Sequence, residues 1–213
     1  MKRQCNHDKS TWTQGGWAAS RVCLGALLAL GLSGCATDQQ KMNAINAVNQ
    51  GFRVEYEKLL AEKGSRTYKL NRPNAFVAMR VALASLGMRT ERQDVTLGHL
   101  AVAAPAPLPL SDEEWRSASE ADLPLLQGLI EPHVGLAAKF VKFEPQGLEV
   151  VINATVLDGA AGTEVSLTVR LREIAAPRSG WPRREYVAPH LLNVGLEKIF
   201  GAFERELRAG PQR

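Results

Sequence analysis

The feature that most constrains the fold is an apolar–polar alternation between residues 148 and 172. Two alternating runs are separated by a glycine-rich turn at residues 158–162. Their apolar members are Leu148, Val150, Ile152, Ala154 and Val156, then Val165, Leu167, Val169 and Leu171. A period of two with one polar face predicts antiparallel strands, covered on one side and exposed to water on the other. A third strand, from Leu136 to Phe143, is expected to complete a meander.

A helix near the C-terminal end is the expected cover for this sheet. It starts around Pro189, which suits a first turn, and its apolar residues recur at helical spacing: Leu192, Leu196, Ile199, Phe203 and Leu207. Further elements are a strand at Thr67 to Leu70, a helix from Ala75 to Leu86 capped by Asn74, and strands at Met88 to Gln93 and Thr96 to Ala103. Together they predict an α+β fold: an antiparallel sheet with helices packed on one face, in a helix-grip-like arrangement.

Residues 104–134 interrupt the regular pattern. Three prolines near the start of this segment exclude a regular helix or a central strand there, because each removes a backbone donor. The capping box that begins at Ser111 predicts a short helix carrying Trp115, and a second helical turn is expected to start at Asp122. We therefore expect a proline-rich insertion, either a connector packed on the surface or a ligand for a groove on a partner.

A further amphipathic helix is predicted ahead of the domain, from about Gln40 to Lys63. Its apolar stripe consists of Ile45, Val48, Phe52, Tyr56 and Leu59. Two interpretations are open: a stalk or partner helix that stands clear of the domain, or a helix that packs on its own domain. The chain thus divides into a leader (1–34), a tether with this helix (35–64) and one α+β domain (65–210).

The leader is typical of an exported protein. Four basic residues precede an apolar run from Val22 to Gly31, which is ten residues long, whereas a membrane-spanning helix needs about 20. This order of charged, apolar and small residues is that of a secretory signal.

The end of the leader, Leu32-Ser33-Gly34-Cys35, resembles the bacterial lipobox. The resemblance implies cleavage before Cys35 and acylation of its thiol and its new amino group. Two or three acyl chains are sufficient for stable membrane anchoring. The residue after the cysteine is Ala36 and not aspartate, which in lipoproteins of this kind implies export to the outer membrane, facing the periplasm.

Removal of the leader changes the charge and the cysteine content. The full chain has 26 basic and 22 acidic residues, and the leader takes four basic and one acidic residue with it, which leaves a net charge of +1. A clustered basic surface for nucleic acid is therefore not expected. Cys5 and Cys23 leave as well, so that Cys35 is the sole remaining cysteine. Neither a disulfide nor a zinc site is expected.

The pattern of polar residues predicts neither catalysis nor a cofactor or metal. His99, His133 and His190 are expected on three separate elements, without the spacing of metal ligands. Ser111 is better explained as a helix cap. The acidic residues that follow it interact favourably with the helix dipole, which explains their position without a catalytic role.

Aromatic and basic residues are the candidate contacts for a partner. They are Trp115 in the insertion and a loop containing Trp181, Arg183 and Arg184. The loop suits lipid head groups or an acidic patch of a partner. The alternative is a solvated loop with Trp181 folded onto the core.

The order of elements resembles the helix-grip domains of the BamC (NlpB) lipoproteins, the C subunits of the β-barrel assembly machinery. The matching segments are Phe76 to Gly87, Thr96 to Ala103 and Leu192 to Leu207. The chain departs from that pattern in having one such domain and a proline-rich insertion. The resemblance implies the fold and the compartment.

These inferences predict a non-enzymatic accessory lipoprotein of the bacterial envelope that contributes to an outer-membrane assembly or transport complex. Its partners would be the membrane, through Cys35, and an envelope protein. The alternative is a lipid-binding auxiliary of an envelope transport system. An enzyme acting on the cell wall would need convergent acids, and Asp94, Glu131 and Glu149 are scattered along the chain.

Overall fold

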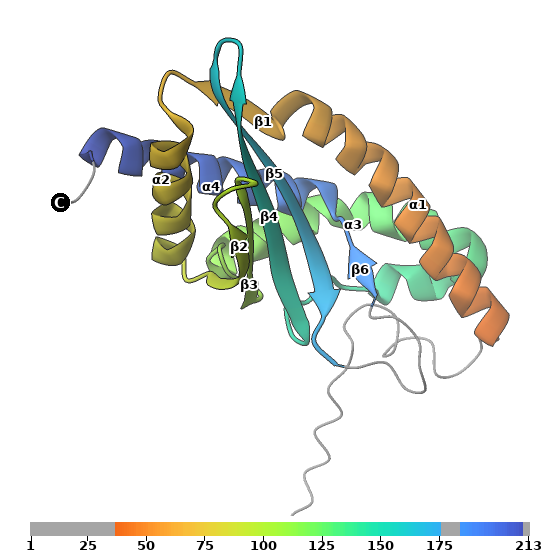
Figure 1. Cartoon of the computed structure of the whole chain (residues 1–213). Helices are drawn as coiled ribbons and strands as arrows, with labels where there is room; N and C mark the ends of the chain where they lie inside the picture. Colours follow the sequence, from red (N-terminus) through yellow and green to blue (C-terminus); the bar gives the residue numbers. More distant parts are fainter. Residues whose placement is uncertain (1–36, 176–183, 211–213) are drawn as a thin grey trace, which may run out of the picture.

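The computed structural model describes residues 37–175 and 184–210. Within these ranges the chain is α+β: an open, six-stranded antiparallel sheet with four α-helices and one 3₁₀ helix (Figure 1). The predicted fold class is confirmed. Several predicted site residues lie outside the described residues: Leu32, Ser33, Gly34, Cys35, Trp181 and Arg183.

The sheet has the strand order β1-β5-β4-β3-β2, and β6 pairs with β5. The bounds are β1 Ser65–Tyr68, β2 Arg89–Asp94, β3 His99–Pro105, β4 Leu148–Gly159, β5 Gly162–Glu173 and β6 Glu185–Tyr186. The alternating segments of the sequence are β4 and β5, which form one long hairpin that closes with Gly159 opposite Gly162.

The predicted strand from Leu136 to Phe143 is wrong. Its first residues form the 3₁₀ helix η1 (Gly135–Phe140). In the sheet, β4 already has β3 on one side and β5 on the other. No edge of β4 is left for a further strand to pair with, although the local sequence is apolar enough to favour one.

The two faces of the sheet differ as the alternation predicts. The inward apolar residues of β4 and β5 are each at most 2% exposed, and α2 (Arg72–Ser85) and α4 (Pro189–Ala209) contact these strands. The outer face carries charged pairs: Arg172 lies 2.7 Å from Glu149 and 3.2 Å from Glu91.

The α4 stripe is confirmed, since Leu192, Leu196, Ile199 and Phe203 are all buried. The start of α2 differs from the prediction. Its cap is Asn71, whose side chain accepts a hydrogen bond from the backbone N–H of Asn74 at 2.9 Å. Pro73 thus lies within the first turn, where a proline is tolerated, and the helix begins earlier than expected.

The segment expected as a connector with two short helices is a single helix, α3 (Asp112–Val134). Pro124 and Pro132 lie inside it, on its exposed side. Burial of its other side, which includes Leu126 and Ile130 at 1% and 0% exposure, outweighs the local cost of a proline. The last two residues of β3 also extend into the proline-rich stretch.

The first helix, α1 (Asp38–Lys63), packs on its own domain, mainly on α3 and also on α4. Its residues Val48 and Phe52 are 3% and 1% exposed. It also covers the edge of β5 between the short strands β1 and β6. There the backbone N–H of Leu167 donates to the carbonyl of Gly64 at 2.8 Å, and that of Val169 donates to Tyr56 Oη at 2.9 Å. The strand edge is thereby protected from pairing with another chain.

Candidate functional site

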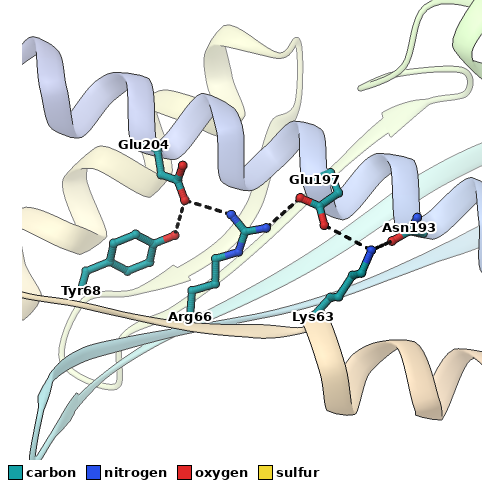
Figure 2. A network of polar contacts seen from close by, with 6 residues as sticks. All are labelled: Lys63, Arg66, Tyr68, Asn193, Glu197 and Glu204. Atoms are coloured by element: carbon teal, nitrogen blue, oxygen red, sulfur yellow. Dashed lines mark hydrogen bonds and ion pairs between the residues drawn. The ribbon is translucent and has the colours of Figure 1, made fainter.

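A network of polar side chains joins the start of the domain to α4, as Figure 2 shows. Its six members come from the α1–β1 junction and from one side of α4: Lys63, Arg66, Tyr68, Asn193, Glu197 and Glu204. Arg66 bridges two turns of α4, at 2.8 Å from Glu197 and 2.9 Å from Glu204. We call this set the α4 network.

The charges of the α4 network are matched within it. Tyr68 Oη donates to Glu204 at 3.1 Å, and Lys63 Nζ donates to Asn193 at 3.0 Å. The guanidinium of Arg66 also lies 4.3 Å from the centre of the Phe200 ring, in a cation–π contact. Such an arrangement fixes α4 in position; it does not present an unpaired acid or base to a substrate.

Burial and pairing shift the pKa values in the network away from neutrality. Burial, followed by the hydrogen bond to Glu204, raises the pKa of Tyr68 to about 12. Desolvation opposes the charge of Arg66, but its hydrogen bonds to Glu197 and Glu204 outweigh it and raise its pKa. Neither group changes its charge near pH 7, so neither is poised for proton transfer.

An apolar groove of about 500 Å³ lies between α2 and the end of α4, next to the α4 network. Tyr68 belongs to both. The groove is lined by residues of β1, the β1–α2 turn, α2 and the end of α4, most of them apolar: Tyr68, Lys69, Leu70, Asn74, Val77, Ala78, Val81, Glu206, Leu207 and Gly210. Val77 and Val81 of α2 are 49% and 39% exposed and form one wall. We call this hollow the α2–α4 groove.

Asp122, a residue of α3, has its carboxylate buried against the start of α4. Its side chain is 1% exposed and accepts hydrogen bonds from the backbone N–H groups of His190 and Leu191, each at 3.0 Å, and contacts His190 Nδ1 at 2.9 Å. The sequence predicted only a local role for Asp122, because nothing near it in the chain indicates contact with a helix 68 residues away. The arrangement is that of a helix cap supplied by α3.

The structure describes two of the predicted partner contacts, Trp115 and Arg184. Trp115 is 3% exposed; its Nε1–H donates to the carbonyl of Phe143 at 3.2 Å, and the two rings stack. It is a core residue and not the surface contact that we expected, because α3 turns it inward. Arg184 is half-exposed, directly before β6, and lies 3.5 Å from Glu173.

The three predicted histidines stay on separate elements, namely β3, α3 and α4. Among the residues that the structure describes, no three potential metal ligands come together. No helix in the described ranges is long and apolar enough to cross a membrane. Comparisons of the chain with protein family models, with curated proteins and with solved structures find no match.

Proposed function

We propose that the chain is a lipid-anchored, non-enzymatic accessory protein of the bacterial cell envelope. Acyl chains on Cys35 hold it to the outer membrane, facing the periplasm, and its domain acts as a scaffold within an assembly or transport complex. The lipobox carries the proposal, and the resemblance to the BamC lipoproteins supports the choice of compartment.

The start of α1 supports a close attachment to the bilayer. Thr37 caps the helix: its Oγ1 accepts from Gln40 N at 3.2 Å, and its own N–H donates to Gln40 Oε1 at 2.8 Å. Cys35 precedes this cap by two residues, which span at most about 7 Å of extended chain. Since α1 packs along the domain, a lipid on Cys35 would hold the domain itself at the membrane, rather than at the end of a long stalk.

The buried acids support a structural role over an enzymatic one. Within the described residues, two carboxylates are buried, Asp122 and Glu173. Asp122 accepts from the first turn of α4, and Glu173 accepts from Tyr186 Oη at 3.0 Å. Both are used in holding elements together, whereas a catalytic acid needs access to a substrate.

The anchor is tested by replacing the proposed acylation site. Cys35→Ser should accumulate as an unprocessed precursor, and Cys23→Ser, a matched change within the leader, should be matured and anchored as the wild type is. The readouts are the mass of the chain and its distribution between membrane and soluble fractions. A Cys35→Ser chain of mature mass that still sediments with membranes would disprove the anchor.

The scaffold role is tested by crosslinking in cells followed by mild detergent extraction. An envelope protein should be recovered in fixed proportion to the chain; recovery of the chain alone would contradict the scaffold. The α2–α4 groove favours one alternative, a lipid-binding auxiliary. Mass spectrometry under native conditions separates the two, because an auxiliary of that kind retains a lipid besides those on Cys35.

A further inference from the structure

Two large apolar side chains project from η1 into solvent. Leu136 is 73% exposed and Phe140 is 79% exposed, the highest values for large apolar side chains in the described ranges. The segment is nevertheless firmly held. Ala138, between them, is 2% exposed, and Phe143, which follows, is buried with its ring stacked on Trp115. A well-packed segment thus presents an apolar pair outward.

This apolar pair lies at the end of the molecule where α1 begins. α3 packs along α1, with Leu129 so close to Gly51 that a β-carbon there would overlap its side chain. Figure 1 shows α1 starting at the end where α3 finishes, and η1 follows α3 directly. The chain that precedes Thr37 reaches Cys35 within two residues. The proposed anchor and the apolar pair therefore share one end of the molecule.

The charges around the pair suit an anionic surface. Lys139 and Lys142 are both exposed and are the charged residues nearest to Phe140 in the chain; the exposed acids Glu131 and Glu144 lie beyond them on either side. Apolar side chains flanked by lysines match the boundary between head groups and acyl chains: the apolar groups enter it, and the lysines meet anionic head groups. Large exposed apolar side chains that are not needed for the core are typical of such contacts.

The geometry points to η1 as a second membrane contact, with Leu136 and Phe140 inserted into the bilayer interface and Lys139 and Lys142 against anionic head groups. The inference rests on the proposed anchoring, because the short link from Cys35 to α1 brings this end of the domain to the bilayer. Two contacts, one covalent lipid and one protein segment, would fix how the domain is oriented on the membrane.

The cysteine content provides the test. A mature chain acylated at Cys35 has no free thiol, since Cys5 and Cys23 leave with the leader. Phe140→Cys then introduces a single site for a polarity-sensitive fluorophore. The matched control is Leu97→Cys, because Leu97 is 66% exposed on the β2–β3 turn, beside the end of β4 that is remote from η1. The full chain is extracted from membranes and placed in vesicles of phosphatidylethanolamine and phosphatidylglycerol.

The label on Phe140→Cys should shift its emission to shorter wavelength and lose intensity when nitroxide lipids are added, and the label on Leu97→Cys should do neither. The shift should be smaller in vesicles of phosphatidylcholine alone, because Lys139 and Lys142 then lack anionic head groups. Water-like emission from both labels would overturn the inference. This result is expected if η1 binds a protein partner instead of the membrane, because the vesicles contain no such partner. If the wild-type chain itself takes up the fluorophore, Cys35 carries a free thiol, and the proposed anchoring on which the inference rests is wrong. Circular dichroism spectra equal to that of the wild type show that both variants are folded.

Discussion

Replacing Asp122 by alanine should destabilise the fold by removing the cap of a helix far away in the chain. Ala188, the N-cap residue of α4, makes no side-chain hydrogen bond to the first turn. Asp122 on α3 takes that role and accepts from the backbone N–H groups of His190 and Leu191, each at 3.0 Å. The variant therefore removes the cap and, with it, the hydrogen bonds that Asp122 makes between α3 and α4.

The size of the effect follows from burial. An N-cap at a helix surface contributes about 1 kcal/mol, whereas a buried N–H group without an acceptor costs about 1–3 kcal/mol. Leu191 is 2% exposed, so that water cannot replace the carboxylate there, while His190 is exposed. We expect Asp122→Ala to lower the free energy of unfolding by about 3 kcal/mol, a large share of the roughly 5–15 kcal/mol of a typical domain.

Urea unfolding followed by circular dichroism measures this change. The control is Glu120→Ala, an exposed position on the same helix, which should alter the free energy of unfolding by less than about 0.5 kcal/mol. Asp122→Asn should have an intermediate effect, because its amide keeps one acceptor oxygen. A loss below about 1 kcal/mol in Asp122→Ala would refute the proposed cap.

Three further predictions concern glycines and tyrosines. Gly98→Ala should cost at least about 2 kcal/mol in the same unfolding assay, because Gly98 has a φ of +68° and an added β-carbon would lie 2.0 Å from the carbonyl oxygen of Val156; wild-type stability would contradict this. Gly128→Ala, on the exposed side of α3 with nothing within 4 Å, should raise the free energy of unfolding by up to about 1 kcal/mol, and a loss would contradict the helix there. The pKa values of all three tyrosines are raised, chiefly by burial: Tyr56, Tyr68 (to about 12) and Tyr186. Since the folded state holds these protons more tightly, their contribution to stability is complete below pH 10 and is lost as the pH rises from about 10 through the folded pKa values; tyrosinate absorbance of the folded chain near pH 10, equal to that in urea, would disprove this.

The parts of the fold that the sequence predicts are those with a persistent local period. The β4–β5 hairpin alternates without a break, and the stripe of α4 keeps its helical spacing through Phe203, because each segment buries one side along its whole length. The cap at Ser111 is likewise local, since donor and acceptor lie three residues apart.

The parts that it does not predict depend on contacts between distant segments. α3 continues through Pro124 because its other side is buried, and residues 136–143 do not form a strand because β4 has no edge to offer. Trp115 is turned into the core because it lies on the side of α3 that packs against the rest of the domain. The partners of Asp122 and the exposure of Phe140 are fixed by packing of elements on one another, which local patterns do not encode.

The covalent state of Cys35 is the most direct test of the proposed anchoring. Intact-mass and fragment spectra of the chain extracted from cell envelopes should show that residues 1–34 are absent, that Cys35 is the first residue, and that the added mass on it equals a diacylglyceryl group and an amide-linked acyl chain. A chain that begins at another residue, or one in which Cys35 carries an unmodified thiol, would contradict the anchor and the membrane orientation inferred from it.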